Sequence, residues 1–141
     1  MSHQDWSDTA PLGAAQTWLL EASAGTGKTY QIASLYLRLV AEQGLPVDGI
    51  LAITFTEAAT SELRDRIRAR LRAALDALDR GATQESDPSI DEVLGRILAE
   101  QPAEELRLRL VRALLDFDLA PISTIHAFSK RMLDEFAFDS G

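Results

Sequence analysis

The stretch that decides the fold runs from residue 22 to residue 29 and reads Ala-Ser-Ala-Gly-Thr-Gly-Lys-Thr. It follows the apolar run Trp18-Leu19-Leu20 and precedes a segment whose apolar residues recur at helical spacing. This order predicts a strand, a glycine-rich turn and a helix. In such a unit the backbone N–H groups of the turn and the positive end of the helix face one anion. A nucleotide triphosphate is the anion that this arrangement suits.

Two residues of this stretch have side chains suited to phosphate chemistry. Lys28 is expected to reach the β- and γ-phosphates, and the Thr29 hydroxyl is expected to ligate Mg²⁺. Ala22 stands where the general P-loop pattern has glycine, and its small side chain still allows a compact loop. The alternative is a glycine-rich turn that contains Gly-Lys-Thr by chance, which the flanking strand and helix disfavour. The predicted nucleotide-binding residues are Ala22, Ser23, Ala24, Gly25, Thr26, Gly27, Lys28, Thr29 and Tyr30.

The composition restricts the class of protein. A length of 141 residues predicts one domain, and the lack of cysteine excludes disulfides and thiolate metal sites. No apolar stretch approaches the length of a membrane span, and residues 1–11 lack a basic segment followed by an apolar core. We therefore expect a soluble cytoplasmic protein without a membrane partner. The net charge of −8 argues against broad nonspecific coating of DNA and leaves room for a narrow basic groove.

Apolar periodicity predicts an α/β fold with a parallel sheet, because the strand candidates are near-continuous apolar runs. The predicted strands lie at 17–21, 50–53 and 120–125. The predicted helices run from Lys28 to Gly44, from Glu57 to Arg80, from a capping box of Ser89 and Glu92, from Pro102 with Leu106, Leu110, Leu114 and Phe117, and through Phe128, Met132 and Phe136. The predicted organisation is a loose leader at 1–15, a P-loop βαβ unit with a long helix at 16–80, a helical insert at 81–117, and a strand with a last helix at 118–141.

The long helix at 57–80 is predicted to bury one apolar arc. That arc consists of Leu63, Ile67, Leu71, Ala74, Leu75 and Leu78. Arginines flank it on both sides, and we expect them to be solvated, with stems that cover apolar surface, and not to form a DNA-binding patch. The six arginines are Arg64, Arg66, Arg68, Arg70, Arg72 and Arg80.

Two further segments follow the second and third predicted strands. Residues 54–64 read Thr-Phe-Thr-Glu-Ala-Ala-Thr-Ser-Glu-Leu-Arg, and residues 124–133 read Thr-Ile-His-Ala-Phe-Ser-Lys-Arg-Met-Leu. Together with residues 21–29, they resemble motifs I, Ia and Ic of superfamily 1 DNA helicases of the UvrD/Rep type. Within that family the likeness is greatest to the RecB-like branch, the β chains of exodeoxyribonuclease V. It extends from about residue 11 to residue 141.

The resemblance implies a P-loop NTPase fold: a partial RecA-like parallel sheet flanked by helices, with an inserted helical segment. It implies ATP and Mg²⁺ as cofactors, 3′-to-5′ movement along single-stranded DNA, and a role in double-strand-break repair and recombination. RecC- and RecD-like subunits are the partners that this branch implies. Carried over by position, Phe55 would contact or stack on a base. Thr54, Thr56, Thr124 and His126 would line the same DNA strand, with the last helix on the DNA side.

Each aromatic candidate has a structural alternative. Phe55 follows a buried strand and could belong to the core, since aromatic side chains are commonly buried. His126 lies near a helix start and could be a satisfied structural histidine. Two other classes of protein also remain open. One is a different P-loop NTPase, such as a nucleotide or small-molecule kinase, and the other is a non-catalytic nucleotide-binding module.

The tripeptide Asp134-Glu135-Phe136 invites comparison with the acidic Mg²⁺-binding motif of these helicases. No strand precedes it, and Phe128, Met132 and Phe136 have helical spacing, so we interpret it as part of a helix. The catalytic acids and the second RecA-like lobe have no counterpart in this sequence. We therefore expect an N-terminal fragment or truncated product that binds nucleotide and does not unwind DNA unaided.

Overall fold

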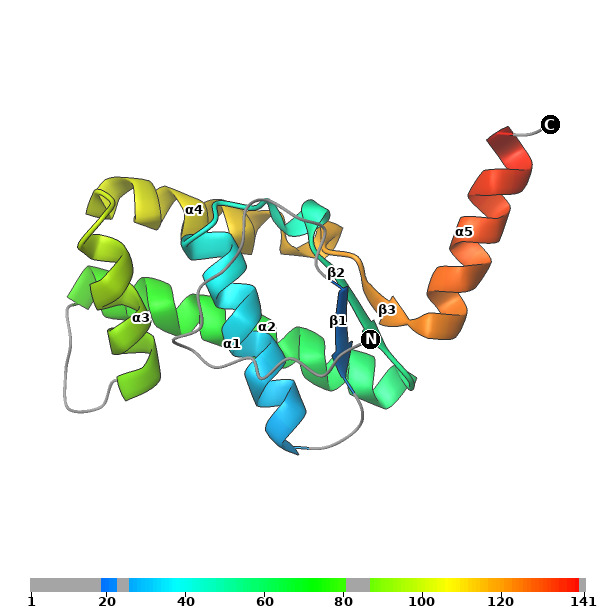
Figure 1. The fold of residues 1–141 in the computed structure, drawn as a ribbon, viewed down its shortest axis with the longest axis horizontal. Coiled ribbons are helices and arrows are strands. Elements are labelled where there is room, and N and C mark those ends of the chain that lie inside the picture. The colour runs from blue at the N-terminus through cyan, green and yellow to red at the C-terminus, as the bar shows by residue number, and fades with distance from the viewer. Residues whose placement is uncertain (1–18, 23–25, 81–86, 140–141) are drawn as a thin grey trace.

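The computed structural model describes residues 19–22, 26–80 and 87–139, which form a parallel sheet flanked by helices (Figure 1). The strands are β1 (Leu19–Ala22), β2 (Leu51–Thr54) and β3 (Ile122–Thr124). The helices are α1 (Thr26–Ala41), α2 (Glu57–Arg80), α3 (Pro88–Leu98), α4 (Ala103–Leu115) and α5 (Ile125–Asp139), with short 3-10 turns at Val47–Gly49 and Phe117–Leu119. The predicted leader at 1–15 lies outside the described residues.

The three strands are parallel and lie in the order β1-β2-β3. Their register pairs Ala22 with Thr54, and Thr54 with Thr124. The last residues of the three strands therefore form one row at the carboxyl edge of the sheet. This confirms the predicted α/β fold with a parallel sheet.

The core lies where α1, α2 and α4 pack on one another. The predicted bounds of α2 are confirmed, and Leu63, Ile67 and Leu71 of its apolar arc are fully buried. Burying one such side chain contributes about 1.5–3 kcal/mol. Leu78, at the end of the arc, is partly buried. The apolar arc thus holds α2 to the rest of the domain over most of its length.

Two arginines of α2 differ from their predicted solvated state. Arg70 is only 7% exposed, and the Arg64 guanidinium donates to the backbone oxygen of Ile122 at 3.0 Å. The expectation was wrong for these two because the helical wheel does not include α3 and β3, which cover them. Arg66 and Arg72 are exposed, as expected.

The start of α3 also differs from prediction. Its N-cap is Asp87, whose carboxylate accepts from the Ser89 backbone N–H at 2.9 Å, and Pro88 occupies the first turn. The predicted capping box of Ser89 and Glu92 is therefore wrong by two residues. Asp and Pro are favoured at these positions because the first helical N–H groups lack intrahelical acceptors.

The end of α1 matches the prediction and is held by α4. Gly44 follows the helix with a φ of 70°, a conformation that glycine adopts without strain. The Arg109 guanidinium donates to the Ala41 backbone oxygen at 2.9 Å, and the Gln101 amide donates to that of Glu42 at 3.2 Å. The predicted helical insert thus caps the helix that follows the glycine-rich stretch.

The other corrections concern the ends of elements. Phe117 was predicted to continue the periodicity of the helix after Pro102, but α4 ends at Leu115 and Phe117 lies buried in a 3-10 turn. The predicted strand at 120–125 is shortened to β3. Helix α5 runs away from the rest of the chain, and its Met132, Leu133 and Phe136 are exposed (Figure 1). Within the described part of the chain, no helix is both long and apolar enough to cross a membrane.

Candidate functional site

The predicted phosphate loop joins β1 to α1 at the carboxyl edge of the sheet. β1 ends at Ala22 and α1 begins at Thr26, so the glycine-rich stretch runs from the end of a strand into the start of a helix. Ser23, Ala24 and Gly25 lie outside the described residues. For Ala22 and for Thr26, Gly27, Lys28 and Thr29, the structure describes the backbone alone.

The start of α1 is suited to binding a phosphate group. Helix α1 has 16 residues, and its first four N–H groups lack intrahelical acceptors. Its first turn contains no acidic residue that would compete with an anion for these donors. The helix dipole adds partial positive charge at the same end. An anionic ligand would therefore be stabilised at the start of α1.

The turn after β2 is closed by threonine hydroxyls. Thr54 is fully buried, and its hydroxyl donates to the Thr56 backbone oxygen at 3.1 Å and pairs with the Thr60 hydroxyl. The Thr56 hydroxyl accepts from the Ala59 backbone N–H at 3.0 Å, so it caps α2. These bonds fix the direction in which α2 leaves the sheet.

The turn after β3 repeats this arrangement. Thr124 is buried, and its hydroxyl accepts from the Ala127 backbone N–H at 3.1 Å at the start of α5. Thr54 and Thr124 are paired in the sheet register, so two threonine-capped helices leave neighbouring strands at one edge. The hydroxyls of both residues serve these turns, and their contact with DNA stays a prediction.

Three predicted DNA-side residues are exposed near this edge. Phe55 is 58% exposed directly after β2, so the alternative that it belongs to the core is wrong. Thr56 is exposed beside it, and His126 is exposed in the first turn of α5. The exposure of His126 also disfavours a buried structural role. An exposed aromatic ring at the end of a buried strand is free to stack on a planar ligand.

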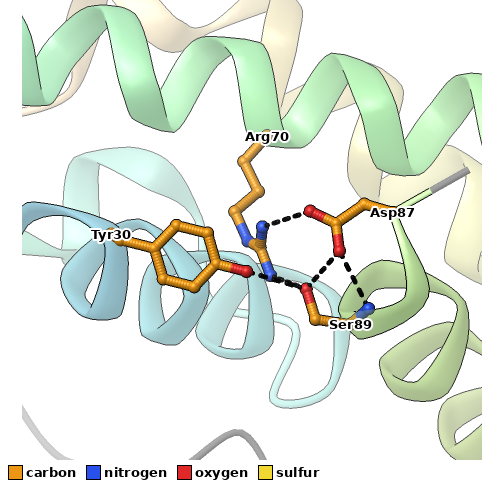
Figure 2. Close-up of polar contacts among 4 residues, drawn as sticks. All are labelled: Tyr30, Arg70, Asp87 and Ser89. Atoms are coloured by element: carbon orange, nitrogen blue, oxygen red, sulfur yellow. Dashed lines mark hydrogen bonds and ion pairs between the residues drawn. The ribbon is translucent and has the colours of Figure 1, made fainter. Parts of the chain in front are cut away.

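A polar cluster that sequence reasoning missed lies beside the start of α1 (Figure 2). Tyr30, predicted to bind nucleotide, pairs its hydroxyl with the Ser89 hydroxyl at 3.0 Å. Arg70 donates to the Ser89 hydroxyl at 2.8 Å and forms an ion pair with Asp87 at 3.4 Å. The hydrogen bond from the Ser89 hydroxyl is the main cause that lowers the pKa of Asp87. The Asp87-Pro88 pair, a typical helix start, was the signal that could have located α3.

The tripeptide Asp134-Glu135-Phe136 lies inside α5 and does not follow a strand directly. Its predicted helical state is confirmed. A depression of about 520 Å³ lies elsewhere, between α2 and α4, and is lined by Arg68, Arg72, Leu75, Val111, Leu114, Leu115 and Asp118. Arg68 lies 11 residues along α2 from its start at Glu57, which is roughly 16 Å along the helix axis from the turn after β2. This depression is therefore separate from the candidate site.

Comparison with known proteins relates this sequence to one family. Residues 2–141 match the model of the UvrD/REP helicase N-terminal domain. The chain is 44% identical over 142 residues to the RecBCD enzyme subunit RecB of Haemophilus influenzae, covering 94% of this chain and 12% of that protein. It is 43% identical over 131 residues to RecB of Escherichia coli and 46% identical over 124 residues to RecB of Mycolicibacterium smegmatis. Each of these two matches covers 87% of this chain and 11% of the relative.

The chain thus spans about a tenth of the length of these relatives. The matched region includes the strand, turn and helix of the glycine-rich stretch and both threonine-capped turns. The match to the family model covers nearly all of the chain. This chain therefore belongs to the UvrD/REP helicase N-terminal domain family.

Proposed function

We propose that this chain is the ATP-binding and single-stranded-DNA-binding N-terminal segment of a RecB-like ATP-dependent 3′-to-5′ DNA helicase and exonuclease. Its role would be in double-strand-break repair and recombination in the cytoplasm, together with RecC- and RecD-like subunits. The names and similarity of the RecB relatives support this proposal. By itself, the segment is proposed to bind its ligands without unwinding DNA.

The proposed domain is part of a RecA-like P-loop fold. Residues 16–80 carry the phosphate loop and the first DNA-side turn, and residues 118–141 carry the second. Residues 81–117 are the helical insert between them. The observation that carries the proposal is the register of the sheet, which aligns the ends of β1, β2 and β3. Ligands of open α/β sheets bind outside the carboxyl ends of the strands.

On the nucleotide side, the chain would bind phosphates through backbone N–H groups at the start of α1. Lys28 would place its ammonium group on the β- and γ-phosphates, and the Thr29 hydroxyl would hold Mg²⁺. When bound, Mg-ATP supplies a phosphoanhydride bond whose hydrolysis releases free energy. The role of these residues is to orient the phosphates and to offset their negative charge.

On the DNA side, Phe55 would stack on a base, while Thr56 and His126 would contact the backbone. Stacking on an aromatic side chain contributes about 1–3 kcal/mol per base and tolerates any sequence. The N–H groups at the starts of α2 and α5 are suitable donors for DNA phosphates. Because β2 is hydrogen-bonded to β1 and β3, the two ligands would occupy turns on adjoining strands.

The test is calorimetric titration of the 141-residue chain with Mg-ATP, beside Lys28→Ala and Lys130→Ala. Lys130 is a matched control because it is an exposed lysine on α5. We expect wild type and Lys130→Ala to bind alike, and Lys28→Ala to lose at least tenfold in affinity. Absence of heat from the wild type at millimolar Mg-ATP, or equal affinity of Lys28→Ala, would contradict the proposed nucleotide site.

A second titration separates this proposal from a kinase or a non-catalytic nucleotide-binding module. Binding of a fluorescent single-stranded oligonucleotide is followed at several salt concentrations. A helicase segment should bind it with an affinity that falls as salt rises, since phosphate contacts release counterions. If the chain binds Mg-ATP but does not bind the oligonucleotide at low salt, this result would favour the other two classes.

A further inference from the structure

Four side chains from three helical segments meet beside the start of α1 (Figure 2). Tyr30 lies on α1, Arg70 lies in the middle of α2, and Asp87 and Ser89 lie at the start of α3. The Asp87 carboxylate accepts from the Ser89 hydroxyl at 2.7 Å and from the Ser89 backbone N–H at 2.9 Å. The Ser89 hydroxyl is also in contact with Arg70 and Tyr30. Ser89 thus joins the other three residues.

Arg70 is the buried charge at the centre of this cluster. One of its terminal nitrogens is 3.4 Å from Asp87 and the other is 2.8 Å from the Ser89 hydroxyl. Its Nε has no hydrogen-bond acceptor among the described residues. The guanidinium carbon lies 4.9 Å from the centroid of the Tyr30 ring, within the range of cation–π attraction. The ring therefore offsets part of the cost of burying the Arg70 charge, which the hydrogen bonds of the guanidinium do not offset completely.

This contact acts on the first turns of α1. Tyr30 follows Thr29 directly, and both lie on the same helix as Lys28. Tyr30 lies in the second turn of α1, so its contacts with Arg70 and Ser89 hold this end of the helix against α2 and α3. The position of this end of the helix decides where the free N–H groups at the start of α1 lie.

We propose that Arg70 is a positioning residue for the phosphate site. Asp87 and Ser89 keep the Arg70 guanidinium in place. Arg70 in turn holds the Tyr30 ring, and thereby the start of α1, in the position that binds phosphate. This inference rests on the proposed nucleotide function. It also gives the start of α3 a role, because two of its residues support a site formed by α1. Small displacements of binding groups weaken such sites strongly.

The test measures the affinity of the 141-residue chain for Mg-ATP by calorimetry. Arg70→Met keeps the length of the side chain and removes its charge, so we expect about a tenfold loss of affinity. Arg70→Lys restores a cation under the ring and should recover part of that loss. Arg80→Met is the matched control, since Arg80 is an exposed arginine on the same helix. It should bind Mg-ATP like the wild type.

A cycle with Tyr30→Leu tests whether the two residues act through one contact. If Arg70 acts by holding Tyr30, the double variant should lose no more affinity than the weaker-binding single variant. If Tyr30 touches nucleotide independently of Arg70, the two losses multiply, and the inference is wrong. Tyr30 is 41% exposed, so its replacement should leave the chain folded.

Urea unfolding of each variant separates positioning from stability. A purely structural Arg70 would lower the unfolding midpoint and leave the affinity of the folded protein unchanged, which would overturn the inference. If the wild type binds Mg-ATP and Arg70→Met binds it equally well, this inference is overturned and the proposed function is not. Wild type that binds no Mg-ATP overturns the proposed function first and this inference with it.

Discussion

Six arginines share helix α2, and their side chains have different surroundings. Arg70 lies buried among Tyr30, Asp87 and Ser89, while Arg66 remains exposed and pairs with Glu62 on its own helix at 3.7 Å. The residue type and the local helix are the same in both cases. The difference comes from the neighbouring helix, because α3 begins beside Arg70. At the scale of the residue, burial and charge pairing are decided by tertiary contacts.

Asp87 should make stability depend on pH in the acid range. The hydrogen bonds from Ser89 hold the pKa of Asp87 below its usual value, which is about 3.9 in an unfolded chain. A lowered pKa in the folded state gives a stabilisation that is complete above this value and is lost as the pH falls through the folded pKa. We therefore expect Asp87→Asn, which can still cap α3, to be less stable than wild type at pH 7. The gap in unfolding free energy should close below about pH 4. A gap that stays constant from pH 7 to pH 3 would contradict this.

Tyr36 should be replaceable by phenylalanine. The ring is fully buried and packs edge-to-face against Phe117, with centroids 6.5 Å apart. Its hydroxyl has no hydrogen-bond partner among the described residues, and burial raises the pKa of Tyr36. Tyr36→Phe keeps the ring contact and removes the unpaired hydroxyl, so we expect the free energy of unfolding to rise by about 1 kcal/mol. Urea unfolding measures this, and a fall in the free energy of unfolding would contradict the assignment of an unpaired hydroxyl.

Some helix ends in this domain are capped by neighbouring residues, and others are capped by residues distant in the sequence. Thr56 and Thr124 cap the starts of α2 and α5 from the adjoining residues. The end of α1 depends instead on Arg109 and Gln101, which lie 68 and 59 residues further along the sequence than the groups they bind. The support of the end of α1 could not be predicted from neighbouring residues, because its donors are distant in the sequence.

Gly44 and Gly95 offer a matched pair of alanine substitutions. Gly44 has a φ of 70°, and an added Cβ would lie 3.0 Å from the Cζ of Arg109, so Gly44→Ala adds strain and displaces the cap of α1. We expect it to lower the free energy of unfolding by about 1–2 kcal/mol. Gly95 lies in helix α3 with open space around it, so Gly95→Ala should raise that free energy by about 0.5–1 kcal/mol. Equal effects of the two substitutions would contradict the assigned backbone conformations.

At the scale of the whole molecule, the sheet brings together three turns that are distant in sequence. Ala22, Thr54 and Thr124 lie in one row, although more than 100 residues separate the first from the last. The apolar faces of α1, α2 and α4 pack against one another, and this packing supports the sheet. The proposed nucleotide and DNA residues therefore share one edge because parallel strands align their carboxyl ends.

Phe55 should matter for DNA binding and little for stability. Because 58% of it is exposed, Phe55→Ala should change the free energy of unfolding by less than about 0.5 kcal/mol. We expect its affinity for a fluorescent single-stranded oligonucleotide to fall by about 1–3 kcal/mol, with Mg-ATP affinity unchanged. Leu115→Ala is the control, since it removes an exposed apolar side chain on α4. If Phe55→Ala and wild type bind the oligonucleotide with equal affinity, the stacking role of Phe55 is contradicted.

Local patterns in the sequence were enough to predict the succession of strands and helices, the bounds of α2 and the family. These properties are local, because periodicity, glycine turns and short motifs depend on residues that are close together in the sequence. It also identified Phe55 and His126 as candidates without deciding whether they were buried. The stretch from Ala22 to Thr29 was enough to predict the turn at which β1 meets α1.

The register of the strands, the exposure of Phe55 and the burial of Arg70 became known only from the three-dimensional structure. It also decided that Arg109 of α4 caps the end of α1. None of these could be obtained from one sequence, because each depends on which distant segment packs beside a given residue. Strand pairing and charge burial are non-local, and a helical wheel contains no information about the neighbours of the helix.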